Sequence, residues 1–226
     1  MKQRTLQLVL ILLFATNCAQ AGEVIDRIVA VVNGHPLLQS DWNDEVRFET
    51  LQHGQMTEAV TNDIRRTAFD RLVEQELIRQ QMQGIYAPDP EAIQQRERDI
   101  RALYPEAKTD EGWRSVIASF GLDHEQLEQS IAAELQTLRF IDIRLRPTVK
   151  VEPAEIESYY RERLVPEIRK NGAEPDPLPS LSTRIHDLLV EQKINQVFFD
   201  WIASLRTQSK IEIFAEPGVQ SASARD

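Results

Sequence analysis

Acidic side chains are the most abundant groups in this sequence that could take part in proton transfer. They gather in three places along the chain: Asp41, Asp44 and Glu45; Glu74 and Glu76; and Glu152, Glu155 and Glu157. Paired carboxylates can act as general acid and base. The same spacings also arise on solvated helix faces and in first helical turns, where carboxylates interact favourably with the helix dipole. We therefore predict structural roles for all three groups and no catalytic residue.

The four histidines, His35, His53, His124 and His186, do not form a metal-binding pattern. No two of them are three or four residues apart, the spacing that places two imidazoles on one helix face. The single cysteine, Cys18, excludes a disulfide framework and a paired-cysteine metal site. The sequence contains neither a GxSxG motif nor a phosphate-binding glycine loop. We expect no metal and no cofactor.

Three tryptophans, Trp42, Trp113 and Trp201, lie among apolar residues at helical spacing. Large apolar side chains in such stripes most often pack in a core, which is the prediction here. A role in lining a binding groove is the alternative, because apolar positions at helical spacing look alike in both cases. The substrate-binding residues are therefore not assigned from the sequence.

Composition places the chain among globular proteins, with 226 residues, 42% of them hydrophobic and 27% charged. The net charge of −10 argues against a general nucleic-acid binder, which needs a basic face.

The N-terminus has the pattern of a secretory signal peptide over residues 1–21. A short basic head precedes an apolar run, and Ala19-Gln20-Ala21 gives a small-residue cleavage site. Cleavage there removes two basic residues, leaving 24 basic against 36 acidic ones, or a charge of −12. Lipidation of Cys18 is the alternative to its removal. No later segment is apolar enough to cross a membrane.

Only the two ends of the expected mature chain have β-strand patterns. Residues 24–32 are rich in β-branched residues, and Asn33-Gly34 then predicts a hairpin turn. Pro36 limits the second strand to a short edge strand. Residues 210–214 (KIEIF) alternate polar and apolar, and we expect them to pair with the hairpin. The predicted fold class is mainly α: a multi-helix lobe with a small N-terminal β-hairpin that a C-terminal strand completes.

Cap residues and apolar periodicity divide the rest of the chain into helices. We expect one helix from Ser40 to about His53 and a longer one from Thr57 to about Met82. Later starts are expected at Asp89-Pro90, at Asp110, at Asp123 with Gln126 as a capping box, and at Pro153. Residues 147–151 should be extended, the helix from Pro153 should fray at Pro166, and a long amphipathic helix should follow from about Leu181.

These segments resemble SurA-type periplasmic chaperones. VIDRIVAVVNGHPLLQSDW resembles the opening of that family, and AFDRLVEQELIRQQMQ resembles its next long helix. FGLDHEQLEQSIAAELQTLRFIDIRLRPTVKVEPAEIESYY is similar to the end of its N-terminal lobe, and INQVFFDWIASLRTQSKIEIF is similar to its C-terminal helix and strand. The implied organisation is a signal peptide (1–21), a helical chaperone domain (22–165), a proline-rich linker (166–180), a helix and strand packing back on the lobe (181–214), and a disordered tail (215–226).

The resemblance implies a periplasmic, ATP-independent chaperone that binds unfolded outer-membrane proteins or other exported polypeptides. Many family members carry parvulin-type prolyl isomerase modules where this chain has residues 166–180, an interval too short to fold one. The expectation is therefore a holdase and not an enzyme. Two alternatives stay open: a prolyl isomerase of the SurA/parvulin type, and an assembly protein that binds one folded target. The oligomeric state and the identity of the clients are not determined by the sequence.

Overall fold

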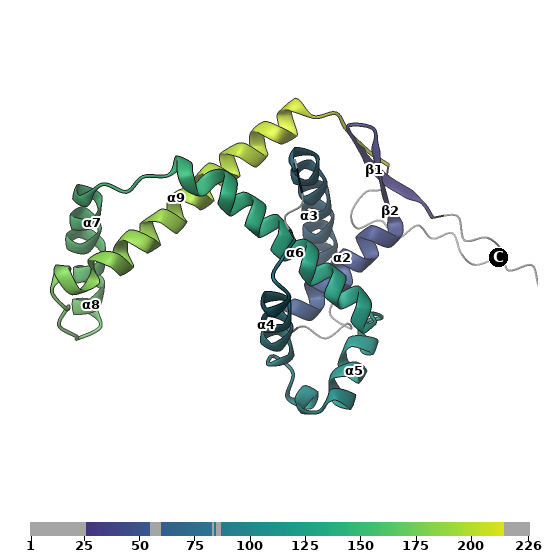
Figure 1. Ribbon diagram of the computed structural model, residues 1–226, viewed down its shortest axis with the longest axis horizontal. Coiled ribbons are helices and arrows are strands. Elements are labelled where there is room, and N and C mark those ends of the chain that lie inside the picture. Colours follow the sequence, from purple (N-terminus) through teal and green to yellow (C-terminus); the bar gives the residue numbers. More distant parts are fainter. Residues whose placement is uncertain (1–25, 55–59, 83, 85–86, 215–226) are drawn as a thin grey trace, which may run out of the picture.

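The structure, a computed structural model, describes residues 26–54, 60–82, 84 and 87–214. The expected signal peptide, Cys18 and the expected tail lie outside these residues. Figure 1 shows a body of packed helices and a small sheet, from which one long helix extends into an arm that carries two shorter helices. The described chain is mainly helical, so the predicted fold class is confirmed.

A three-stranded antiparallel sheet joins the two ends of the described chain. It is made of β1 (Ile28–Val32), β2 (His35–Leu38) and β3 (Ile211–Ile213), in the order β2-β1-β3. Asn33 and Gly34 take positive φ angles of 51° and 87°, as the predicted tight hairpin turn requires. Pro36 lies in an edge strand, where its missing N–H removes no ladder bond.

The body and the arm are built mainly of helices. In the body they are α2 (Gln39–Gln52), α3 (Asn62–Gln81), α4 (Pro90–Arg101), α5 (Asp110–Ser119) and α6 (His124–Leu145). The arm contains α7 (Pro153–Tyr159), a π-helical turn (Tyr160–Leu164), α8 (Val165–Lys170) and the first half of α9 (Leu178–Gln208). Short 3₁₀ turns occupy Pro105–Lys108 and Arg146–Thr148.

Two of the predicted helix starts are confirmed by side-chain caps. The Asp89 carboxylate accepts a hydrogen bond from the N–H two residues further on, at 3.0 Å. Asp123 and Gln126 form the predicted reciprocal capping box. Helix α6 ends at Leu145, as expected, but Pro147 lies in a 3₁₀ turn instead of an extended segment.

The prediction that Ser40 is the N-cap of the first helix is wrong, because the N-cap residue is Leu38. Helix α2 begins at Gln39, and the Ser40 hydroxyl donates a hydrogen bond to Asp26 instead of capping the helix. The Asp41 carboxylate accepts the N–H of Leu38 at 2.9 Å, so a side chain within the first turn takes over the role of a cap.

The predicted start of the next helix, Thr57, lies outside the described residues. Helix α3 begins at Asn62, where the Thr61 hydroxyl accepts the N–H of Ile64 at 3.3 Å. In α5 the cap is likewise a threonine, Thr109, one residue before the expected Asp110. Both helices are thus capped by a threonine hydroxyl, which accepts a hydrogen bond from a backbone N–H of the first turn.

The segment expected as a linker, residues 166–180, is partly helical. Pro166 does not end the preceding helix, because the π-helical turn changes the register and leaves the proline in the first turn of α8. Residues 171–177 join α8 to α9, with Gly172 at a positive φ of 77°. Helix α9 therefore starts at Leu178, earlier than the expected Leu181.

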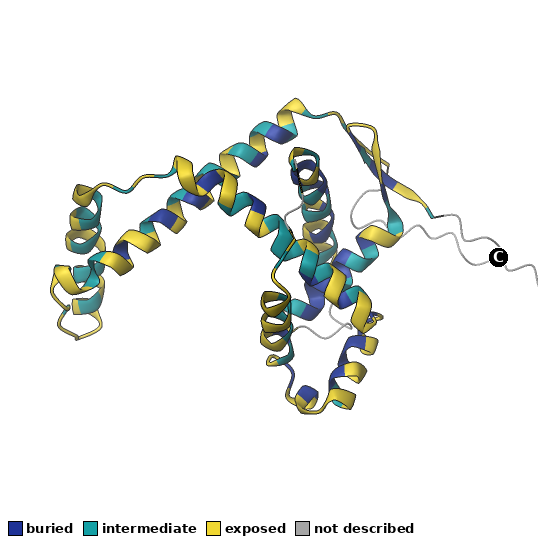
Figure 2. Cartoon of the chain, in the orientation of Figure 1, coloured by how far each residue is buried: buried dark blue, intermediate teal, exposed yellow. Residues whose placement is uncertain are grey.

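Buried apolar residues form two cores in the body and a smaller one in the arm (Figure 2). The first core lies between the sheet, α2, α3 and the end of α9, and includes Trp42 and Phe69. The second joins α4, α5 and the first half of α6 around Trp113. Among the described residues, the third cluster joins Leu145 at the end of α6 to Val190 and Ile194 of α9, and Ile185 is also buried further along the arm, so the arm has fewer buried apolar residues than the body.

Candidate functional site

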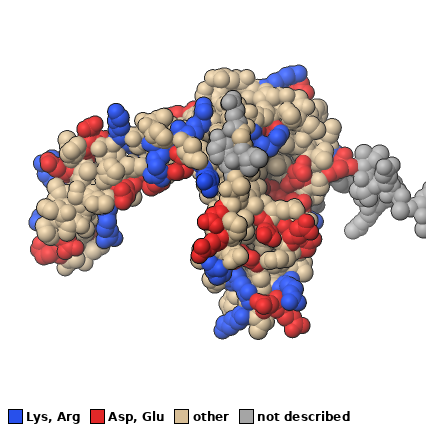
Figure 3. Space-filling view, viewed as in Figure 1, with Lys and Arg blue, Asp and Glu red and all other residues tan. Residues whose placement is uncertain are grey.

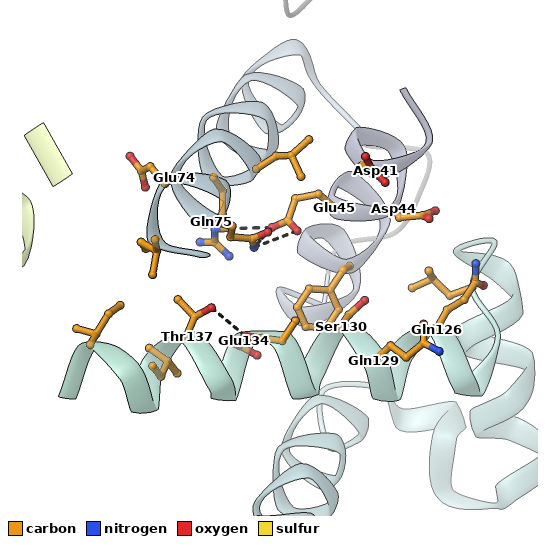
Figure 4. A pocket seen from close by; sticks show the side chains of 18 of the residues that line it. Asp41, Asp44, Glu45, Glu74, Gln75, Gln126, Gln129, Ser130, Glu134 and Thr137 are labelled. Carbon is orange, nitrogen blue, oxygen red and sulfur yellow. Dashed lines mark hydrogen bonds and ion pairs between the residues drawn. The ribbon is translucent and has the colours of Figure 1, made fainter. Parts of the chain in front are cut away.

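A groove of about 650 Å³ lies between α2, α3 and α6, with Phe198 of α9 also contributing to its lining (Figure 4). Its lining combines carboxylates and apolar side chains with amides, hydroxyls and Arg71. Carboxylates come from all three walls: Asp41, Asp44, Glu45, Glu74 and Glu134. Apolar side chains include Phe48, Leu72, Leu138, Ile141 and Phe198.

The walls of the groove are held in place by the core beneath them. The Trp42 indole N–H donates to the carbonyl oxygen of Arg65 at 2.9 Å, and its ring meets Phe69 edge-on with centroids 5.4 Å apart. This contact fixes α2 against α3. On the other side, Phe140 of α6 lies with its ring centroid 6.2 Å from that of Trp201 of α9.

Glu45 is the most unusual polar side chain of the groove. It is buried, with its side chain about 10% exposed, and points toward Gln75 across the space between α2 and α3 (Figure 4). The Gln75 amide donates to both carboxylate oxygens, at 3.2 and 3.3 Å. Burial raises the pKa of Glu45 to about 7. The carboxylates of Glu49 and Glu134 add to this rise, whereas Gln75 and Arg71 oppose it.

Neighbouring carboxylates have closer cations than Glu45 has. Arg71 reaches Glu49 at 2.5 Å but lies 4.0 Å from Glu45. Three more carboxylates of the groove lining form ion pairs with arginines that lie outside the lining. These pairs are Asp44 with Arg47 at 2.6 Å, Glu74 with Arg206 at 3.1 Å, and Glu134 with Arg96 at 3.1 Å. Glu45 is thus a buried carboxylate with an amide donor and a distant guanidinium.

Leu138, Ile143 and Phe199 are apolar residues open to solvent, of which Leu138 lines the groove and Ile143 and Phe199 follow lining residues in the chain. Leu138 of α6 is 53% exposed, and Ile143 further along the same helix is 51% exposed. Phe199, next to the lining residue Phe198, is 65% exposed. Exposed apolar surface next to a groove is a common mark of a surface that binds a partner.

The structure separates the three predicted acidic groups. Asp41, Asp44, Glu45 and Glu74 meet at the groove, whereas Glu152, Glu155 and Glu157 lie on the arm. Glu152 and Glu157 are exposed, as predicted for solvated positions. The Glu155 carboxylate accepts a hydrogen bond from Lys193, which lowers its pKa.

The prediction of solvated faces is wrong for Glu45 and Glu76, which are both buried. Burial opposes the ionised form of Glu76, but Arg79 donates to it at 2.7 and 2.8 Å and Gln80 at 2.6 Å. These hydrogen bonds outweigh the burial, so the pKa of Glu76 is lowered. Tertiary packing, which periodicity alone does not reveal, decides both outcomes.

The histidines are exposed and are not brought together. His53 and His124 lie 3.8 Å from Glu49 and 3.4 Å from Glu97, while His186 contacts the adjacent Asp187. Among the described residues, no three acidic, histidine or cysteine side chains are placed to hold a metal ion.

The tryptophan prediction is confirmed for Trp42 and Trp113, which are about 5% and 4% exposed. Trp201 is only half-buried, and the Arg144 guanidinium lies 5.3 Å from its ring centre. It borders the apolar end of the groove through its contact with Phe198, whose ring centroid is 6.3 Å away.

No groove residue was assigned from the sequence, although α2 carries part of a signal. Asp44 and Glu45 each lie three or four residues from both Asp41 and Phe48, so the four residues share one face of α2. Glu45 also directly precedes a residue of the buried stripe, Val46. This pattern indicates one wall only, because the rest of the lining comes from α3, α6 and α9.

The fold is therefore a mainly helical body, closed by a terminal three-stranded sheet, with an open groove and an extended arm. Residues 4–140, more than half of the chain, match the family model of the SurA-like N-terminal domain. The chain belongs to this family. No curated protein matches the chain. None of the described helices combines the length and the apolar character needed to cross a bilayer.

Membership supports a chaperone-type role of the SurA family, whose members are periplasmic and bind unfolded exported polypeptides. The matched region is the chaperone part of that family and not its catalytic part. The match ends within α6 at residue 140, so it includes every residue of the groove lining except Ile141 and Phe198.

Proposed function

We propose that this protein is an ATP-independent periplasmic holdase, which binds unfolded outer-membrane proteins in transit and limits their aggregation. The observation that carries the proposal is the groove between α2, α3 and α6, most of whose lining lies within the matched chaperone domain. Its mixture of exposed apolar surface, amides and carboxylates suits loose binding of many sequences better than selection of one small ligand.

Unfolded barrel strands alternate lipid-facing apolar residues with polar ones. Apolar side chains of such a strand would contact Leu138, Ile141 and Phe198, while its polar groups face the amide and carboxylate side of the groove. Binding lowers the free concentration of the unfolded chain by mass action, without any chemical step. Dissociation constants on the order of micromolar, about −8 kcal/mol, allow passive release.

Light scattering of a urea-unfolded outer-membrane barrel protein, diluted with and without this protein, tests the proposal. The same barrel protein folded in detergent is the binding control. Suppressed aggregation without binding to the folded form supports a holdase. No suppression at a severalfold molar excess contradicts it, and binding to the folded form alone would favour an assembly partner. Catalysis of X-Pro isomerisation at substoichiometric concentration would favour an isomerase.

A further inference from the structure

The groove contains a buried carboxylate that is poorly matched to its present surroundings. Glu45 receives hydrogen bonds from the neutral Gln75 amide, and the nearest guanidinium nitrogen, of Arg71, is 4.0 Å away. We propose that the groove selects extended polypeptide segments in which a lysine or arginine is flanked by apolar side chains, and that Glu45 binds the cation. This inference rests on the proposed function and names the class of segment recognised.

Charge complementarity supports this occupant. Five carboxylates line the groove, and Arg71 is the cation among the described lining residues. Asp44, Glu74 and Glu134 pair with arginines outside the lining, so the attraction for a ligand's cation comes mainly from Asp41 and Glu45. The space-filling view shows acidic side chains gathered over α2 and the start of α6, on the side of the body near the sheet (Figure 3). A cationic side chain that approaches this region is attracted, whereas an acidic segment or a phosphate is repelled.

Burial makes the pairing with Glu45 stronger than a surface ion pair. A charge-assisted hydrogen bond in a poorly solvated position is stronger than a neutral one. The ligand's cation would give Glu45 the close ionic partner that Glu49 already has in Arg71. A purely apolar segment would bury Glu45 further without supplying a donor, which is costly.

The apolar half of the groove sets the second requirement. Leu138 and Ile141 lie on α6, and Leu72 lies on α3, beside the carboxylates. Because alternate residues of an extended segment point to opposite sides, a cation and its neighbours contact different parts of the lining. A segment with one central cation and apolar neighbours therefore satisfies both halves at once.

The pairing also makes binding depend on pH. Because Glu45 has a pKa of about 7, a bound cation must favour its ionised form, and affinity rises between pH 6 and pH 8. Charged groups face Glu45 from each packed helix: Asp41, Asp44 and Glu49 on α2, Arg71 and Glu74 on α3, and Glu134, which pairs with Arg96, on α6. His53 also lies 3.8 Å from Glu49 and is a second titratable group near Glu45. The part of the pH dependence of binding that comes from Glu45 is therefore the difference between the wild type and Glu45→Gln.

Fluorescence anisotropy with two labelled, end-capped peptides tests the inference. The peptides differ only at the central residue, lysine or glutamine, which is flanked by phenylalanine and leucine in both. We expect the lysine peptide to bind the wild type about tenfold more tightly. Glu45→Gln should abolish this preference. Glu128→Gln should retain it, because Glu128 is an exposed residue of α6 outside the groove lining and carries the same charge change.

The outcomes separate the inference from the proposed function. If the wild type suppresses client aggregation but binds both peptides equally, or if Glu45→Gln keeps the preference, the inference is overturned and the holdase stands. If neither peptide binds and the client aggregates, the proposed function fails as well. If Glu45→Gln does not fold, the wild type alone still tests the inference. Its preference for the lysine peptide over the glutamine peptide should be present at low salt and weaken as salt is added.

Discussion

Asn33 and Lys210 are joined by two reciprocal hydrogen bonds although they are 177 residues apart. The Asn33 N–H donates to the Lys210 carbonyl oxygen, and the Lys210 N–H donates to Asn33 Oδ1, both at 2.8 Å. The side-chain amide nitrogen of Asn33, Nδ2, also donates a hydrogen bond to Oε1 of Gln80 on α3 at 2.8 Å. One turn residue therefore ties the N-terminal hairpin, a body helix and the C-terminal strand together.

Replacing Asn33 should destabilise the protein in two separable steps. Asn33→Gly keeps the positive φ but loses the side-chain hydrogen bonds, at an expected cost of about 1 kcal/mol. Asn33→Ala adds the cost of placing a β-carbon in the left-handed region, for a total of about 2 kcal/mol. Urea unfolding measures both. Equal stabilities of the two variants would contradict the backbone part of this explanation.

Glu45→Gln should stabilise the protein at alkaline pH. The folded-state pKa of about 7 is above the ordinary value of 4.5, so the contribution of Glu45 to stability is fully present below pH 4.5 and is lost as the pH rises through 7. Glutamine does not ionise. We expect a gain of about 1–3 kcal/mol at pH 8 and almost none at pH 4.5. Urea unfolding at the two pH values checks this, with Glu128→Gln as control, and a pH-independent difference would contradict it.

Leu138 offers a test of the groove that leaves the core intact. Leu138→Ser should change the free energy of unfolding by less than about 0.5 kcal/mol, because the side chain is 53% exposed. It should nevertheless weaken binding of an unfolded client severalfold, measured by anisotropy. Leu103→Ser is the matched control, since Leu103 is 50% exposed and lies outside the groove lining. Equal weakening by both changes would show that general surface apolarity, and not the groove, determines binding.

Gly112 should tolerate no side chain, although it lies in a helix. A β-carbon there would lie 2.2 Å from the carbonyl oxygen of Glu106 and 3.2 Å from the Thr109 hydroxyl. Glycine to alanine within a helix ordinarily stabilises by up to about 1 kcal/mol. Here we expect Gly112→Ala to destabilise by at least about 1 kcal/mol in thermal or urea unfolding. Arg114→Ala, at an exposed position of the same helix, should be nearly neutral, and a stabilised Gly112→Ala would refute the close contact.

Local chemistry explains which parts of the fold can be predicted from the sequence. Asn33-Gly34 predicts the hairpin because both residues adopt positive φ readily. Asp123 with Gln126 predicts a helix start because the capping box needs only residues within one turn. The pairing of residues 211–213 with β1 follows because a two-stranded hairpin needs a third strand to be stable.

Nonlocal packing explains what the sequence did not predict. Pro166 is a helix breaker by local rules, but the π-helical turn before it lets the helical path continue. Glu45 carries a charged side chain and is expected at the surface, yet packing of α2 with α3 and α6 buries it. The groove itself exists only where three helices distant in sequence meet, so no single amphipathic stripe could identify its lining.

Photo-crosslinking of an unfolded client tests the central claim, that the groove is where the client binds. Benzoylphenylalanine would replace Gln129, which lines the groove, or Gln94, an exposed residue of α4 outside the lining. We predict crosslinks to a urea-unfolded barrel protein from position 129, none above background from position 94, and none from either position to the folded barrel. Equal crosslinking from both positions, or none from position 129 while aggregation is still suppressed, would contradict the assignment of the groove.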